Sequence, residues 1–174
     1  MSRKLAIKSL TASDLTLFEW HFQNKNAGNQ KAINLNADVF IDSLYPSLPT
    51  IAETRQGRLP VDLFVYGPGL AVEHNLQRKI VKHGTYKNWR LDGEFIFNPV
   101  DDPTRFNILT PGDYVILDFA GEIYPKTLKA LFIAEALDVD QPLHQYCRNL
   151  VGENRMVVAS DSILRRLIAD AAPL

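Results

Sequence analysis

The segment Pro111-Gly112-Asp113-Tyr114-Val115-Ile116-Leu117-Asp118-Phe119 carries the clearest strand signal in the chain. Its first three residues are typical of a tight turn, and the run that follows is almost wholly apolar, with β-branched and aromatic side chains. A short apolar run behind such a turn predicts a buried β-strand. The apolar segment from Thr127 to Ile133 predicts a second strand.

Outward from this point, most of the chain divides into short segments of the same kind. Further strands are expected at residues 4–10, 32–35, 58–67, 76–82, 87–97 and 155–159. Helices are expected only between or beyond them, at residues 13–22, 37–44, 137–150 and 161–169. Many short strands with few helices predict a mostly β protein with peripheral helices, folded as a small, mostly antiparallel barrel. The length suits a single domain that spans residues 1–174.

The composition is that of an ordinary globular protein, with 46% hydrophobic and 22% charged residues. No apolar run approaches the roughly 18 residues that a membrane span needs. The N-terminal residues lack the apolar core of a signal peptide. Cys147 is the single cysteine, which excludes a disulfide framework and a cluster of thiolate ligands. We therefore expect a cytoplasmic protein with no membrane association.

The net charge of −1 hides an uneven distribution along the chain. Residues 1–90 contain 12 Lys/Arg and 7 Asp/Glu, whereas residues 91–174 contain 7 Lys/Arg and 13 Asp/Glu. Such an asymmetry suggests that one surface faces an anion. The basic residues are densest between His74 and Arg90, and a stretch of this kind attracts phosphate backbones whatever the base sequence.

The sequence contains no recognisable catalytic motif. It has neither a Gly-rich phosphate loop nor a Gly-x-Ser-x-Gly elbow, and its four histidines are scattered singly (His21, His74, His83 and His144). We therefore expect a module that is not an enzyme, with no catalytic residues, no metal and no cofactor. One alternative is a compact magnesium-dependent nuclease that uses Glu94, Asp101 and Asp102. Two others are a domain whose basic face binds an acidic protein, and a domain that binds single-stranded nucleic acid by aromatic stacking.

Two segments combine amides, cations, an aromatic residue and a glycine, which is the chemistry that reads base edges in the major groove. They run from Glu19 to Lys31 and from Gln77 to Arg90. Trp20 and Trp89 in these segments could stack on bases, but tryptophan more often anchors the root of a loop in the core. The expected DNA-contacting residues are Lys25, Asn26, Asn29, Gln30, Lys31, Arg78, Lys79, Lys82, His83, Tyr86, Lys87, Asn88 and Arg90. Lys8 is expected to position the DNA backbone as well.

Several short motifs, taken in order, resemble a known family. They are Lys8–Asp14, Ala27–Leu35, Leu44–Leu48, Lys87–Arg90 and Leu109–Val115. In this order and spacing they resemble the N-terminal effector-binding domain of EcoRII-type restriction endonucleases. The Pro-Gly-Asp turn before an apolar strand is also similar to the plant B-three transcription-factor domain, which shares that fold. The resemblance covers nearly the whole chain.

The resemblance implies a DNA-binding pseudobarrel, an open barrel of the B-three type, that grips the major groove with two arms. The arms correspond to residues 24–31 and 78–90 of this chain. It further implies a monomeric recognition module of a bacterial restriction–modification system, with a separate C-terminal nuclease domain in the parent chain and a CC(A/T)GG-like target. Two departures affect the base-reading residues. Asn29 stands where the family has a histidine before the glutamine, and the second arm holds fewer arginines than in the family.

Overall fold

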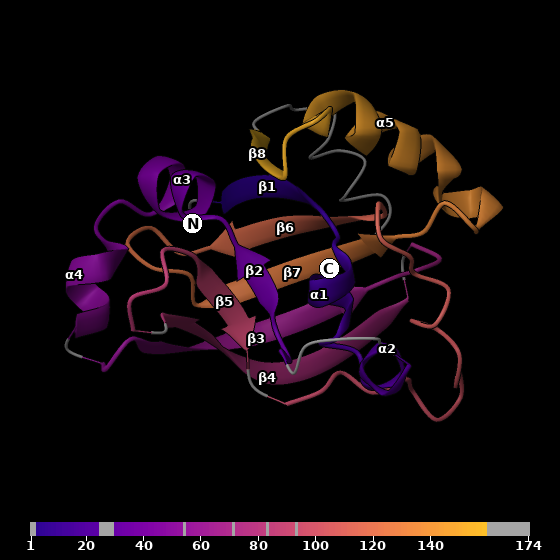
Figure 1. The fold of residues 1–174 in the computed structure, drawn as a ribbon, viewed down its shortest axis with the longest axis horizontal. Coiled ribbons are helices and arrows are strands. Elements are labelled where there is room, and N and C mark those ends of the chain that lie inside the picture. Colours follow the sequence, from indigo (N-terminus) through magenta and orange to yellow (C-terminus); the bar gives the residue numbers. More distant parts are fainter. Residues whose placement is uncertain are drawn as a thin grey trace.

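The computed structural model describes residues 3–24, 30–53, 55–70, 72–82, 84–92 and 94–159. Eight strands form one curled, half-barrel sheet (Figure 1). They are β1 (Arg3–Ser9), β2 (Ile33–Leu35), β3 (Arg58–Tyr66), β4 (Glu73–Lys82), β5 (Trp89–Asp92), β6 (Tyr114–Ala120), β7 (Thr127–Ile133) and β8 (Met156–Ala159). The mostly β architecture expected from the sequence is thereby confirmed in its coarse form.

The helical elements are few and short. They are α1 (Ala12–Leu15), α2 (Glu19–Gln23), α3 (Ala37–Val39), η1 (Phe40–Leu44), α4 (Leu48–Glu53), η2 (Asp138–Asp140) and α5 (Gln141–Val151). The segment η1 is one turn of π-helix that continues α3, whereas η2 is a 3-10 turn. None of the helices in these residue ranges combines the length and the apolar character that crossing a membrane requires.

The strand order is β2-β5-β4-β3-β7-β6-β1-β8. Every neighbouring pair among these strands is antiparallel except β3 and β7, which run parallel with Leu63 opposite Leu128. The sheet is therefore mixed. The parallel pair joins two antiparallel halves, each of four strands, and the N-terminal strand β1 lies between β6 and β8 in the C-terminal half.

Two apolar clusters hold the sheet, one against each of its faces. The larger cluster fills the concave side, where Phe119 meets Phe40 of η1 and Phe132 meets Phe18 and Phe106. In the smaller cluster, Leu143 and Cys147 of α5 pack against the opposite face of β1, β6 and β7. These three strands are therefore covered on both faces, which agrees with the fully buried residues of β6.

Three local features differ from the sequence prediction. The single helix expected at residues 13–22 is split into α1 and α2, because Phe18 forms a parallel bridge with Ile96 instead of continuing the helix. The helix α4 was not expected. The strands β4 and β5 pair as a hairpin, which we call the basic hairpin. Its second strand, β5, ends at Asp92 rather than at residue 97. The helix expected at 161–169 lies outside the described residues.

Candidate nucleic-acid interface

The outer face of the N-terminal half of the sheet is not covered by α5. Along β3 the side chains alternate, with Leu59, Val61 and Leu63 buried while Arg58 and Asp62 are exposed. The register places residues 77 and 79 of β4 on the same outer face as the exposed residues of β3. This face and the strands β5 and β2 at its edge form the surface to which both predicted arms connect.

Both arms adjoin one edge of the sheet. The first arm leads into β2, and β2 pairs with β5, the second strand of the basic hairpin. The register sets Ile33 opposite Leu91 and Leu35 opposite Trp89. The first arm therefore enters at one end of β5, and the hairpin turn lies at the other end. The length of β5 therefore separates the root of the first arm from the hairpin turn. From Trp89 to Asp92 the strand rises three times by about 3.3 Å, which gives about 10 Å.

Residues 25–29 of the first arm fall outside the described residues, and with them the predicted contacts Lys25, Asn26 and Asn29. The Gln30 side chain turns back, and its amide nitrogen donates to the backbone oxygen of Ala32 at 2.9 Å. Lys31 is exposed, with its ammonium group 4.5 Å from the centroid of the Phe95 ring. Lys31 is thus the described cation of this arm that is available to a ligand.

Strand alternation divides the basic residues of β4 between two faces. Lys79 lies opposite Asp92 on the outer face, and Arg90 of β5 shares that face through its pairing with Val81. Arg78 and Lys82 point the other way, towards the concave side. The continuous basic stretch in the sequence is therefore two separate groups on the surface.

Arg78 is largely committed to holding the loop that follows the hairpin. Its guanidinium group donates to the backbone oxygens of Gln77 at 2.6 Å and of Phe95 at 2.8 Å. Burial lowers the pKa of Arg78, and the nearby charge of Glu94 acts in the opposite direction. The buried Nε atom has no hydrogen-bond partner among the described residues.

The hairpin turn carries two exposed residues of the predicted contact set, Tyr86 and Lys87. Tyr86 is 63% exposed, and the guanidinium group of Arg90 lies 5.3 Å from its ring centroid. Lys87 is exposed beside them. The ammonium group of Lys82 instead donates to the backbone oxygens of Gly84 and Tyr86 and so closes the turn. His83 lies outside the described residues.

Asn88 has a structural partner. Its Oδ1 atom accepts a hydrogen bond from the backbone N–H of Ala37 at 3.0 Å. The side chain therefore caps the N-terminus of α3, the role that sequence position would give to Asn36. The Oδ1 atom of Asn36 is buried without a partner among the described residues. Asn88 can reach DNA only if it gives up this cap.

A cluster of aromatic rings lies beside the first arm and was not predicted as a unit. The rings of Phe22 and Phe95 lie 4.9 Å apart, and Phe97, which is 54% exposed, meets Phe95 edge to face at 6.0 Å. Trp20 is 40% exposed on α2, whereas Trp89 is buried in the core. The prediction that tryptophan anchors a loop root is therefore confirmed for Trp89 alone.

The expectation for Lys8 is wrong. Lys8 is 2% exposed, and its ammonium group lies 2.7 Å from a carboxylate oxygen of Asp14, which is fully buried. This pairing was not predictable from the sequence, because Lys8 belongs to an alternating strand in which its side chain could equally face solvent. This cation cannot contact a DNA backbone.

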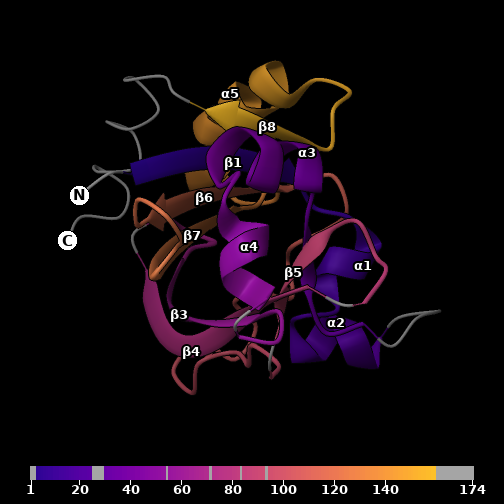
Figure 2. The same ribbon diagram turned by 90° about the vertical axis from the view of Figure 1, so that its left-hand side faces the viewer.

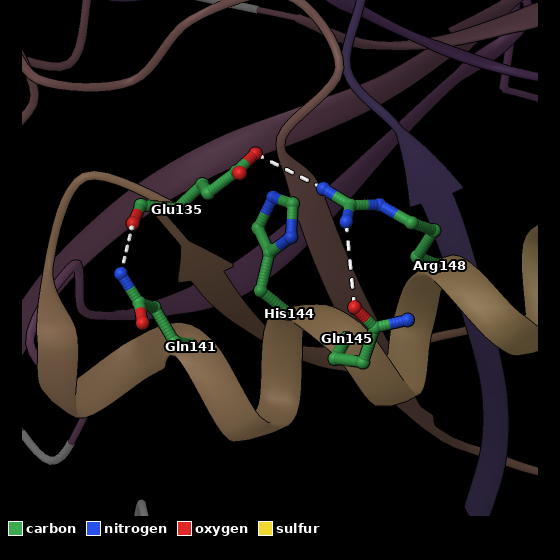
Figure 3. A pocket seen from close by; sticks show the side chains of 5 residues that line it. All are labelled: Glu135, Gln141, His144, Gln145 and Arg148. Atoms are coloured by element: carbon green, nitrogen blue, oxygen red, sulfur yellow. Dashed lines mark hydrogen bonds and ion pairs between the residues drawn. The ribbon is translucent and has the colours of Figure 1, made fainter.

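A second polar site lies under α5 and was also missed. His144 Nε2 lies 2.9 Å from an oxygen of Asp113, and Glu135, Gln141, Gln145 and Arg148 line the pocket above (Figure 3). In the described part of the chain, the single group of three potential metal ligands is Asp113, Glu135 and His144. The carboxylates proposed for the nuclease alternative, Glu94, Asp101 and Asp102, form no such group there.

Comparisons with protein families, with curated proteins and with solved structures find no match for this chain.

Proposed function

We propose that the chain is a sequence-specific double-stranded DNA-binding domain of the pseudobarrel type. In this proposal the chain is the effector-binding module of an EcoRII-type restriction endonuclease, which is bacterial and cytoplasmic. The module is monomeric, and the nuclease domain follows it in the parent chain. The observation that carries it is the convergence of the two cation- and amide-bearing arms on the edge formed by β2 and β5. The roughly 10 Å between the arm roots suits a major groove about 12 Å wide.

The accessible side chains give each arm a role. Lys31, Lys79 and Lys87 are exposed, so they are suited to contact phosphates, which position the protein without reading sequence. Arg90 is half-buried with its guanidinium group near the Tyr86 ring, and we assign to it the bidentate contact that arginine makes with guanine. Asn88, Lys82 and Gln30 already hold backbone groups, and they contribute mainly by shaping the arms.

Selection from a randomised duplex library, followed by titration of the selected duplex and a scrambled one, tests the proposal. Arg90→Ala should weaken selected-site binding by about 1–3 kcal/mol and relax specificity at one position. Lys87→Ala should weaken both duplexes alike and reduce the salt slope by about one. Arg155→Ala is the matched control, because Arg155 is an exposed arginine beside β8, at the opposite end of the strand order from β2 and β5.

The rival functions predict different results in the same assays. A library without enrichment, or Arg90→Ala acting equally on both duplexes, contradicts sequence-specific reading by this edge. Tighter binding to single strands than to duplex favours the stacking alternative, for which Phe97 and Trp20 offer exposed rings. Cleavage of a plasmid by the isolated chain with magnesium favours the nuclease alternative.

A further inference from the structure

Three side chains of metal-ligating type converge at α5. This helix lies on the side of the molecule away from β4 and α2 (Figures 1 and 2). Asp113 comes from the turn before β6, Glu135 from the end of β7 and His144 from α5. One ligand atom from each lies within 4.8 Å of the other two. The side chains of Asp113 and His144 are 3% and 2% exposed, whereas that of Glu135 is 63% exposed at the mouth.

We propose that this group binds a divalent transition-metal ion, with His144 Nε2 and one oxygen from each carboxylate as ligands. One imidazole and two carboxylates suit zinc, for which three protein ligands and a water complete a tetrahedral site. The adjoining pocket of about 170 Å³ is lined entirely by polar and charged side chains. It therefore has room and partners for the water.

The two buried ligands are held in place by a second layer of contacts. Asp113 accepts hydrogen bonds from the backbone N–H of Thr110 at 2.8 Å and of Glu135 at 3.2 Å. The ring of Tyr114 packs edge to face against His144 at 4.9 Å. Such outer contacts orient metal ligands and reduce the cost of ordering them. Two of the three ligands are thus preorganised.

Binding requires two small rearrangements. The ion replaces the His144–Asp113 hydrogen bond. The exposed Glu135 side chain rotates inward, because ligand atoms about 2 Å from one zinc ion must lie within roughly 4 Å of each other. Arg148 competes for Glu135, with a nitrogen-to-oxygen distance of 3.0 Å. This ion pair is 47% and 63% exposed, and such pairs change an equilibrium by at most about fivefold.

The test is thermal unfolding of the full chain after treatment with EDTA, with and without added zinc. Zinc at about 100 times its Kd should raise the midpoint by roughly 5–10 °C. Cobalt in the same site should give visible absorption bands. Glu135→Gln removes a ligand at an exposed position and should abolish most of the shift. Glu153→Gln, an exposed acid outside the group, should keep the shift.

A second variant excludes metal bound elsewhere. Arg148→Ala removes the competitor of the ion and should tighten zinc binding, by up to about fivefold. No shift with zinc or cobalt in the unaltered chain overturns the proposal. So does a shift that Glu135→Gln leaves intact, or an affinity that Arg148→Ala does not raise. DNA binding is measured separately at the opposite side of the molecule, so either proposal can fail alone.

Discussion

Asp14 ties three elements together through one buried carboxylate. Its oxygens accept hydrogen bonds from Lys8 Nζ at 2.7 Å and from the backbone N–H groups of Thr11 and Asn34, each at 3.0 Å. The bond to Thr11 is half of a capping box that begins α1. Since a buried charge is tolerated only when its partners are complete, Asp14 is a point at which β1, α1 and β2 become mutually dependent.

Asp14→Ala should therefore lower the free energy of unfolding by about 3–5 kcal/mol, because it leaves the Lys8 ammonium group buried without its counter-charge. Urea denaturation measures the loss. Adding Lys8→Met to the same chain should recover part of it, since the orphaned charge is then gone. Strictly additive effects of the two substitutions would show that the pair is not coupled.

Asn88→Ala should cost about 1 kcal/mol of stability, the usual value for loss of an N-terminal helix cap. Asn88→Asp keeps the acceptor oxygen and is the matched control, with stability close to that of the unaltered chain. A normal denaturation midpoint for Asn88→Ala, together with loss of discrimination between duplexes, would instead assign Asn88 to base reading.

At the scale of elements, strands were predictable because short windows of the sequence are either almost wholly apolar, as in β6 and β7, or alternate between apolar and polar, as in β3. Residues 114–119 and 127–133 were correctly placed, and the break at Gly84 marks the hairpin turn. Helix breaks were not predictable. The end of α1 depends on a backbone bridge between Phe18 and Ile96, which are far apart in the chain.

The candidate sites were predictable only where neighbours in sequence are neighbours in space. The hairpin turn satisfies this condition. The partners of Asn88 and His144 do not, because each lies on a segment that the fold brings from elsewhere in the chain. Asp14, the partner of Lys8, is only six residues away, but it belongs to α1 and not to the strand that carries Lys8. A pattern of residue types in the chain therefore overestimates how many cations of a basic stretch are free.

The docking of α5 can be followed through Cys147, the one cysteine of the chain. Its thiol is fully buried, and burial raises its pKa to about 12. At pH 8 a disulfide reagent should react with the folded protein only when α5 opens, and much faster in denaturant. A thiol that reacts in the native state as fast as free cysteine would contradict this packing.

At the scale of the whole molecule, two histidines make stability depend on pH. Burial lowers the pKa of both His21 and His74, and for His74 the charges of Arg105 and Arg78 lower it further. The unfolded chain therefore binds more protons than the folded one below about pH 6.5. Stability should fall as the pH drops through that value towards the folded pKa values of the two histidines.

Denaturation midpoints at pH 7.5 and pH 5.5 check this dependence, with the chain carrying His21→Gln and His74→Gln as reference. The reference should lose less stability on acidification. Asp140 acts in the opposite sense, because burial raises its pKa, but it is present in both chains. Equal losses in the two chains would rule out the histidines as the cause.

The position of β1 has a consequence for synthesis of the chain. Its two partner strands begin at Tyr114 and Met156, so β1 leaves a ribosome well before either of the strands with which it pairs. At about 5–20 residues per second, the wait for β6 lasts roughly 5–20 s. Throughout it, Leu5 and Ile7, both buried in the finished protein, have no sheet to join. A nascent chain halted before residue 114 is thus the form that chaperones and proteases would meet.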